Sequence, residues 1–200
     1  MKIMFKKIEK NGFYYGFPVI LMTTKDKETG KNNITPLSSS FVLGNTVTVG
    51  IGMGNKGFQN IEIGSDVTLN IPDEKLYENV KSIEKFTGTV EISEVKRKLG
   101  YIYCENKFEV GKFTEMLGKT VNTVGIKECP IHLETKVTDI IKKDWFAIVV
   151  FEIQGIFVSE DILKDDTHID TKKWKPLIYK FREYTSTGER LGLNFNFQEI

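Results

Sequence analysis

The sequence predicts a mainly β fold, in which an antiparallel sheet closes into a barrel and short helices connect some of the strands. About six segments rich in β-branched and aromatic residues follow one another, separated by turns and short helical stretches. No repeat and no Pro- or Gly-rich linker divides the chain. Residues 1–200 are therefore expected to form one domain.

The first two strands form a predicted hairpin. Residues 18–24 are rich in strand-forming side chains, and Gly30 in the polar stretch 25–33 supplies the reversal. Another strand is predicted over residues 45–54, where glycine recurs at every second position. This spacing leaves one face of the strand without side chains. Either a ligand or another backbone segment approaches this face closely, or the strand is bulged and strongly twisted. The glycines are Gly50, Gly52 and Gly54.

A short helix, a strand and a longer helix come next. One or two helical turns are predicted over residues 56–63, with Gly64 as the stop, and residues 67–71 form a strand. The clearest helix covers residues 72–88, because Pro72 opens it and an apolar face follows. That face is made of Leu76, Val80 and Ile83.

The second half of the chain is less regular at first. Short helices are predicted over residues 93–99 and 106–116. Strict alternation over residues 130–141 indicates a half-exposed strand, and the apolar run 145–151 indicates a strand covered on both faces. Residues 167–200 are rich in aromatic and basic side chains, so we expect them to dock on the domain as a C-terminal extension.

Charge and composition argue against several classes of protein. The chain carries 28 basic and 27 acidic residues, a net charge of +1, so no overall field attracts nucleic acid or an anionic membrane. Cys104 and Cys129 are too few for a disulfide framework and lack the spacing of a zinc site, which indicates free thiols. With no secretory segment and no apolar run of membrane-spanning length, we expect a soluble, cytoplasmic protein.

No pattern of catalytic or metal-binding residues stands out. Ser38–Ser40 lack the G-x-S-x-G elbow of a hydrolase, and only His132 and His168 could serve as an imidazole base. The two histidines are far apart and are not paired with the cysteines, so a metal site is not predicted.

A phosphate site fits the sequence better. A proline turn followed by short hydroxyl side chains offers several neutral donors to one anion, and the start of the helix after Asn55 adds positive potential there. The donors are Thr35, Ser38, Ser39 and Ser40, and Lys56 adds a point charge. Neither a P-loop nor a dinucleotide G-x-G-x-x-G motif is present. These residues predict a mononucleotide such as FMN.

Longer stretches of the chain resemble a known family. They read "YGFPVILMTTKDKETGKNNITPLSSSFVLGNTVTVGIG", "NKGFQNI", "LNIP", "FTGT", "NKF", "ECPIHLETKV" and "HIDTKKWKPLIYKFREY". In this order they closely resemble the flavin reductase-like, FMN-binding split-barrel family, which includes NAD(P)H:flavin oxidoreductases and flavoredoxins. The resemblance covers nearly the entire chain and implies a homodimer of split β-barrels, with FMN bound near the interface of the two subunits.

The resemblance also implies which residues bind the cofactor. The serine-rich segment would lie along the flavin and its phosphate, a second segment would bind the phosphate, and C-terminal side chains would pack near the flavin or the partner subunit. At residue 57 the family commonly has threonine, so one phosphate contact would come from a backbone amide or be absent here. The implied residues are Thr35, Pro36, Leu37, Ser38, Ser39, Ser40, Phe41, Lys56, Gly57, Asn60, Trp174, Arg182 and Tyr184.

The activity implied by the resemblance is an FMN-dependent oxidoreductase that takes hydride from NAD(P)H. Reduced flavin would pass electrons to oxygen, free flavin, an organic acceptor or an electron-transfer protein, and no catalytic acid or base is required. The alternative is a flavin-binding electron carrier or flavin store without turnover. A third reading is a barrel that binds another small molecule or single-stranded nucleic acid through exposed aromatic side chains, although the near-zero charge argues against nucleic acid.

Overall fold

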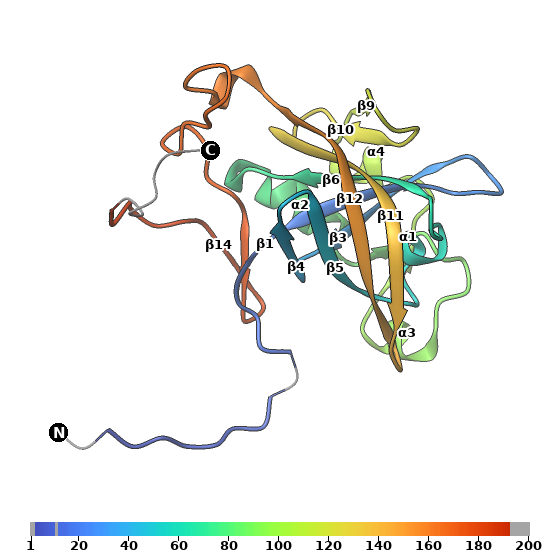
Figure 1. Ribbon diagram of the computed structural model, residues 1–200. Helices are drawn as coiled ribbons and strands as arrows, with labels where there is room; N and C mark the ends of the chain where they lie inside the picture. The colour runs from blue at the N-terminus through green and yellow to red at the C-terminus, as the bar shows by residue number, and fades with distance from the viewer. Residues whose placement is uncertain (1–2, 11, 193–200) are drawn as a thin grey trace.

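The computed structural model describes residues 3–10 and 12–192, and its centre is a seven-stranded antiparallel sheet (Figure 1). The two longest strands, β11 and β12, pair with each other in the middle of this sheet. From edge to edge the strands are β3 (Asn32–Leu37), β2 (Ile20–Lys25), β6 (Asp66–Ile71), β11 (Ile131–Lys142), β12 (Phe146–Val158), β5 (Thr46–Gly52) and β4 (Ser40–Leu43).

The two edge strands of the sheet are consecutive in the chain. Only Ser38 and Ser39 separate the end of β3 from the start of β4, so the sheet must curl until its edges meet at this link. The mainly β class is confirmed. The expected closure is different, because no ladder of hydrogen bonds joins β3 to β4 within the described part of the chain. The edges are linked by the covalent chain at one corner, and the cavity described below lies there.

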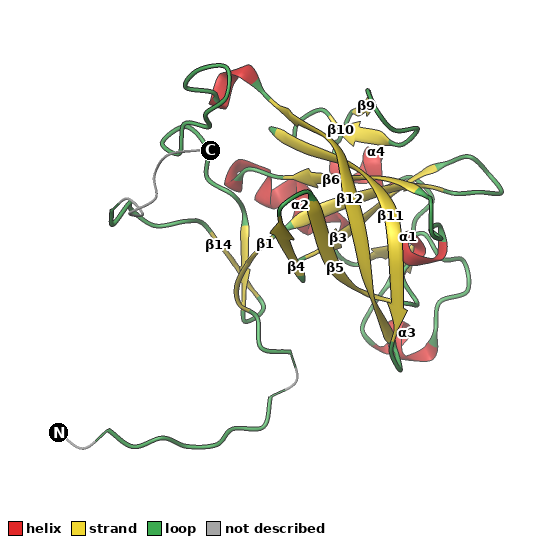
Figure 2. Cartoon of the chain, viewed as in Figure 1, coloured by secondary structure: helices red, strands yellow, loops and turns green. Residues whose placement is uncertain are grey.

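Smaller elements surround the sheet (Figure 2). The N-terminal strand β1 pairs with β13, which brings residues 15–18 beside residues 178–180. Three small sheets are formed by β1 (Tyr15–Pro18), β13 (Ile178–Lys180) and β14 (Glu183–Thr185), by β9 (Glu115–Leu117) and β10 (Val124–Ile126), and by β7 (Phe86–Thr87) and β8 (Ile102–Tyr103). The helices are α1 (Lys56–Gln59), α2 (Tyr77–Ile83), α3 (Glu94–Lys98) and α4 (Lys107–Gly111), with 3-10 turns η1 (Glu74–Leu76) and η2 (Glu160–Ile162).

The sheet separates two hydrophobic clusters. Along β2, Ile20 and Met22 pack into the cluster inside the curled sheet, whereas Leu21 points to the opposite face. There it meets Val80 and Ile83 of α2 and Phe108 of α4. Because side chains alternate across a strand, a strand covered on both faces reads as a continuous apolar run, which is the pattern of residues 19–22. The predicted hairpin is confirmed as the pair β2 and β3, with Gly30 at φ +69°.

The predicted helix over residues 72–88 is shorter in the structure. It begins as the 3-10 turn η1, capped by the side chain of Asp73, and continues as α2 only to Ile83. Residues 86–87 leave the helix and pair in parallel with residues 102–103. A pairing between segments so far apart in the sequence is not visible in a local helical pattern, so the helix was predicted too long.

The strand over residues 130–141 was predicted to be half exposed, and this is wrong for its first half. His132 and Glu134 are both buried, at 4% and 3% exposure. The loop before the strand covers them: Glu134 accepts hydrogen bonds from the amides of Lys119 and Thr120, and His132 Nε2 donates to Ile126 O at 2.8 Å. The second face of β12, predicted to be covered, is only half-buried at Ile148 and Val150.

Burial of His132 predicts that stability depends on pH. Burial lowers the pKa of His132 below its usual value of 6.5, so the unfolded chain binds a proton more readily than the folded one. Stability should therefore be fully present above pH 6.5 and fall as the pH drops below it. Melting temperatures at pH 7.5 and 5.5 test this. His132→Gln should flatten the dependence, and a variant that keeps the slope of the wild type would contradict the prediction.

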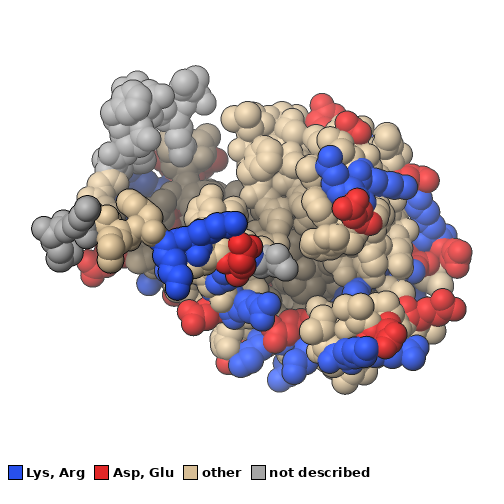
Figure 3. All heavy atoms as spheres, turned by 90° about the horizontal axis from the view of Figure 1, so that it is seen from below, with Lys and Arg blue, Asp and Glu red and all other residues tan. Residues whose placement is uncertain are grey.

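Basic and acidic side chains are mixed over the face shown in Figure 3, in keeping with the net charge of +1. Within residues 3–10 and 12–192, no helix is long and apolar enough to cross a membrane. The same residues contain no group of three or more His, Cys, Asp or Glu side chains suited to hold a metal ion.

Candidate functional site

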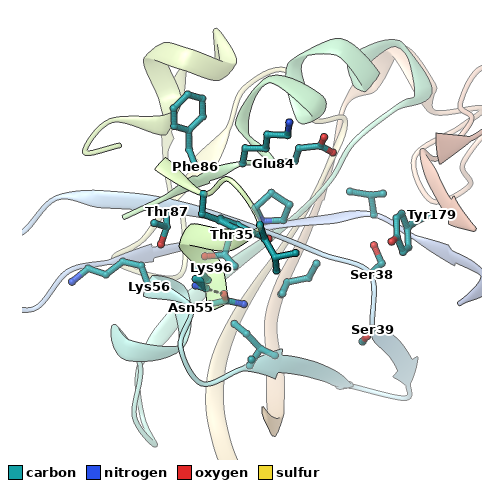
Figure 4. Close-up of a pocket in the computed structure, with 18 of the residues that line it drawn as sticks. Thr35, Ser38, Ser39, Asn55, Lys56, Glu84, Phe86, Thr87, Lys96 and Tyr179 are labelled. Atoms are coloured by element: carbon teal, nitrogen blue, oxygen red, sulfur yellow. Dashed lines mark hydrogen bonds between the residues drawn. The ribbon is translucent and has the colours of Figure 1, made fainter. Parts of the chain in front are cut away.

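A cavity of about 810 Å³ lies at the corner where β3 passes into β4. Its walls come from the β3–β4 link, from β5 and the start of α1, from residues 84–107, and from residues in or next to the sheet of β1, β13 and β14. In Figure 4, Asn55, Lys56, Thr87 and Lys96 lie on one side of the cavity and Ser38, Ser39 and Tyr179 on the other. Cavities that bind small ligands in proteins are typically of this size.

The first wall is the hydroxyl-rich segment predicted from the sequence, and five consecutive residues of it line the cavity. Thr35 Oγ1 accepts a hydrogen bond from Asn33 Nδ2 at 3.0 Å, which leaves its own hydroxyl hydrogen available. Ser39 Oγ shares a hydrogen bond of 2.8 Å with the hydroxyl of Tyr14. The five residues are Thr35, Pro36, Leu37, Ser38 and Ser39.

Glycine is required opposite Ser39. The amide of Gly50 donates to Ser39 O at 2.7 Å, and a Cβ on Gly50 would lie 3.1 Å from Ser39 Cβ. Ser39 therefore lies close to the bare face predicted for this strand, and Gly50 and Gly52 also line the cavity. At Gly50 the close approach is that of the β3–β4 link, and β5 pairs with β4 and β12 without a bulge.

At the start of α1, Lys56 lines the cavity but its charge is already compensated. Its ammonium forms an ion pair with Asp26, which lies in the turn of the β2–β3 hairpin. The hydrogen bond from Lys56 and those from Glu28 and Thr29 hold the pKa of Asp26 well below its usual range. Lys56 therefore ties α1 to the hairpin, and its full positive charge is not free for a ligand.

Replacing Lys56 with Ala is expected to lower stability and to weaken anion binding only modestly. Asp26 would keep its hydrogen bonds from Glu28 and Thr29 but lose its counter-charge. Because water screens the pair, with the Lys56 side chain 27% exposed, we expect a loss of about 1 kcal/mol in the free energy of unfolding. Urea denaturation measures it. Adding Asp26→Asn to the variant should restore part of the loss, and a variant as stable as the wild type would contradict the expectation.

Gly57, where the resemblance described above implies threonine, is enclosed by its neighbours. A Cβ at this position would lie 2.7 Å from Met22 Cε and closer still to Thr35 Oγ1. Thr35 therefore occupies the space that a side chain at residue 57 would need. In this chain the hydroxyl group at this corner is provided by β3 and not by α1.

The third wall of the cavity, formed by residues 84–107, was not predicted from the sequence. We call residues 86–107 the strap, since they run from β7 through α3 and β8 to the start of α4. Thr87, Lys96 and Lys107 of the strap line the cavity. Lys96 Nζ donates to Gly54 O at 2.7 Å and to Asn55 Oδ1 at 3.0 Å, and this anchors the strap to the start of α1 (Figure 4). The sequence signals for this wall were the "FTGT" and "NKF" stretches of the family resemblance.

The fourth wall, at the small sheet of β1, β13 and β14, is aromatic. Tyr179 packs edge-on against Tyr14 and Tyr184, with ring centroids 5.4 and 5.9 Å apart. The hydroxyl of Tyr184 donates to Glu84 at 3.2 Å, and burial raises the pKa of Tyr184 above its usual value. Arg182 lines the same wall from the β13–β14 turn, where it has a positive φ of 74°. A residue other than glycine is strained in this conformation.

The remaining predicted residues do not line the cavity. Phe41 is 61% exposed on the edge strand β4, and Ser40 precedes it. Asn60 is buried, where its Nδ2 donates to Thr24 Oγ1 at 3.1 Å, and Trp174 packs against the cluster inside the sheet. A role of these four residues in cofactor binding stays a prediction. The same holds for the predicted residues that do line the cavity. Neither histidine lines the cavity.

Comparison with known proteins shows the family. The family model described as "Flavin reductase like domain" matches residues 13–188. The chain belongs to the flavin reductase-like family. It is also 38% identical over 194 residues to the uncharacterized protein YdfE of Bacillus subtilis (strain 168), covering 96% of this chain and 93% of that protein. Membership in this family supports a flavin cofactor and a redox function of the oxidoreductase kind.

Solved structures share the fold of this flavin reductase-like protein. The flavoredoxin of Desulfovibrio vulgaris (Miyazaki F) superposes with a TM-score of 0.80 at 22% identity, covering 97% of this chain and 99% of that one. A protein of Shewanella frigidimarina NCIMB 400, described as having a split barrel domain, superposes with a TM-score of 0.68 at 18% identity, covering 90% and 86%. The split-barrel class is thereby confirmed.

Proposed function

We propose that this protein is an FMN-dependent oxidoreductase that transfers hydride from NAD(P)H to bound flavin and passes electrons on to flavin, oxygen, a small organic molecule or a protein acceptor. The observation that carries the proposal is one cavity, in a flavin reductase-like fold, that combines ammonium groups and the hydroxyl of Thr87 on one side with serine hydroxyls and an aromatic wall on the other. A flavin mononucleotide has the matching chemistry, since its ring is aromatic and its phosphate is anionic.

The residues present fit such a ligand. Five cationic side chains and a single carboxylate, Glu84, line the cavity, which favours an anion. Thr35, Ser38 and Ser39 would donate hydrogen bonds to the flavin and its ribityl phosphate, and the backbone at Gly50 and Gly52 leaves room beside them. The tyrosines would pack against the ring. When bound, FMN supplies a ring that accepts a hydride and gives up electrons singly or in pairs.

The chain itself would act by binding and orientation. Tyr14 fixes the rotamer of Ser39 through their hydrogen bond, and the short link between β3 and β4 would hold Ser38 and Ser39 in position for the flavin. Such rigid elements hold reacting groups at productive distances, which lowers the entropic part of the barrier. No side chain of the cavity is required to move a proton in this proposal.

Flavin titration followed by anaerobic mixing tests the proposed function. Purified protein should quench FMN fluorescence on binding, and NADH or NADPH added under nitrogen should bleach the absorbance of the bound flavin. If neither nucleotide reduces the flavin although FMN binds, the enzymatic proposal fails. If FMN does not bind at all, flavin chemistry as a whole fails for this cavity.

The second candidate is a flavin-binding electron carrier without turnover. The similarity in fold to two flavoredoxins, at TM-scores of 0.80 and 0.79, favours it. A carrier should bind FMN and accept electrons from a reduced protein partner or dithionite, but bleach slowly with NADH and NADPH. The rate of flavin reduction by nicotinamide therefore separates the two candidates.

The remaining proposals concern assembly and location. We propose a homodimer, since the edge strand β4 exposes Phe41, Val42 and Leu43 at 61%, 56% and 77%. An exposed apolar edge of this kind suits pairing with a second copy. Light scattering on the wild type and on Phe41→Glu would test it, with a monomeric variant as the expected result.

A cytoplasmic location, without nucleic acid or membrane partners, stays part of the proposal and agrees with two free cysteines.

A further inference from the structure

Near the N-terminus, an exposed apolar segment covers residues 3–10, which we call the arm. All residues of the arm are exposed, and none of them lies in a helix or strand. The arm runs away from the body of the protein (Figure 1). Four large apolar side chains in it are between 61% and 96% exposed, and contiguous apolar groups of this kind mark interaction sites. They are Ile3, Met4, Phe5 and Ile8.

Contacts at the base of the arm set its direction. The ring of Phe13 packs edge-on against Phe181, with 5.1 Å between centroids, and Lys10 Nζ lies 4.2 Å from the centroid of the same ring. The amide of Phe181 donates to Tyr14 O at 2.7 Å. Phe181 has a φ of +47° in the β13–β14 turn, a conformation that strains an aromatic residue. Such strain indicates a functional role for the turn, and its contacts fix the path on which the arm leaves the body.

The sheet has an unprotected edge to which an extended segment can pair. β4 is bonded to β5 on one side, and within residues 3–10 and 12–192 no strand pairs with its other side. Natural edge strands are usually protected by a charged side chain, a proline or a bulge. β4 reads Ser-Phe-Val-Leu and pairs with β5 in unbroken register, so it has none of these. The opposite edge strand, β3, contains Pro36.

The arm and β4 match in length and in chemistry. Eight extended residues span about 27 Å and the strand of four residues about 13 Å, so the arm can cross a gap and still cover the strand. Main-chain hydrogen bonds would satisfy the free groups of β4, as they do when an extended peptide adds a strand to a sheet. The apolar side chains of the arm would pack against those of β4, which are Phe41, Val42 and Leu43.

The arm does not cover the β4 of its own chain. The Tyr14 hydroxyl is bonded to Ser39, just before β4, but the segment that precedes Tyr14 lies on Phe181 and continues away from the sheet. A second copy can accept the arm without breaking these contacts, and a two-fold axis lets each copy accept the arm of the other. Direct pairing of two β4 strands would leave both arms in water.

We propose that the arm of each copy adds as a strand to β4 of a second copy, so that two copies exchange arms about a two-fold axis. This inference rests on the homodimer of the proposed function and names the contact that forms it. Tyr14, at the base of the arm, also lines the cavity and bonds to Ser39. An arm seated on the second copy would therefore hold one wall of the cavity in place.

Cross-linking between two marked copies tests which segments meet. One full-length chain would carry Ile8→Cys, and a second chain, made larger by a tag, would carry Val42→Cys. Both would carry Cys104→Ser, and Cys129 is buried. After mixing and exchange of subunits, a short bis-maleimide should join one copy of each kind, and neither variant alone should give a covalent dimer.

Two results of this experiment would overturn the proposal. A covalent dimer formed by Val42→Cys alone would show that β4 pairs with β4. An internal cross-link in a chain that carries both new cysteines, with none between copies, would place the arm on the β4 of its own chain.

Charged substitutions in the arm give an independent readout. In analytical ultracentrifugation, Phe5→Glu and Ile8→Glu should each raise the dissociation constant of the dimer at least about a hundredfold, because each apolar contact is lost twice in a symmetric pair. Ile63→Glu is the matched control, since Ile63 is 64% exposed and lies outside the arm and β4. This variant should dimerise like the wild type.

The same measurement separates this inference from the proposals on which it rests. If the wild type is dimeric and both arm variants dimerise equally well, the inference is overturned and the homodimer stands. A monomeric wild type would defeat the homodimer and the exchange of arms together. Neither result decides the oxidoreductase proposal, which depends on the FMN titration described above.

Discussion

Ser39→Leu is expected to abolish flavin binding at the proposed site, with a dissociation constant at least about a hundredfold higher. Ser39 lies on the two-residue link between the sheet edges and lines the cavity. Its Cβ faces Gly50, where an added carbon would lie only 3.1 Å away, a tight contact. A leucine side chain must therefore turn into the cavity, where it takes up the room required by the ring. Titration of FMN by fluorescence quenching measures the change.

Ser39→Ala is the matched control for bulk. It removes the hydroxyl that bonds Tyr14 but adds no volume, so FMN affinity should fall by only about fivefold, the value of one neutral hydrogen bond. Both variants should retain cooperative thermal unfolding. If Ser39→Leu binds FMN as well as Ser39→Ala does, the flavin does not pass the β3–β4 link, and the hydroxyl-rich segment has another purpose.

Gly57→Thr is expected to lower the free energy of unfolding by about 3 kcal/mol, the upper range for overpacking a filled site. The new Cβ would overlap with Thr35 Oγ1 and press on Met22 Cε, and both neighbours are themselves buried. The backbone of α1 would have to move away from β3, and Lys56 would move with it. Urea unfolding of the wild type and the variant measures the loss.

A second substitution shows whether the clash is the cause. Thr35→Ala removes the oxygen that Gly57→Thr would meet, so the double variant should lose clearly less stability than the sum of the two single changes. Gly54→Ala is the control, since a Cβ there meets nothing within 4 Å. Additive losses in the double variant would mean that the two residues do not share one space. They would also remove the explanation for glycine at residue 57.

Several features of the fold follow from local chemistry and were predicted for that reason. The β2–β3 hairpin depends on strand-forming residues around a polar turn with Gly30, whose φ of +69° favours glycine. The capping side chains Ser93 and Asn106 begin the two short helices within the predicted ranges. The hydroxyl-rich stretch after Pro36 was identified as a ligand segment because short polar side chains are unusual between strands, and it lines the cavity.

The sequence by itself thus determined the β class, the hairpin and one wall of the cavity, since each depends on neighbours within a few residues. Tertiary structure alone decided that Lys56 is neutralised by Asp26, that Thr35 excludes a side chain at residue 57, and that Lys107 lies buried in the cavity. A lysine near the start of a short helix reads locally as an exposed residue. Its burial comes from packing against a distant strand, and that packing is set by the path of the whole chain.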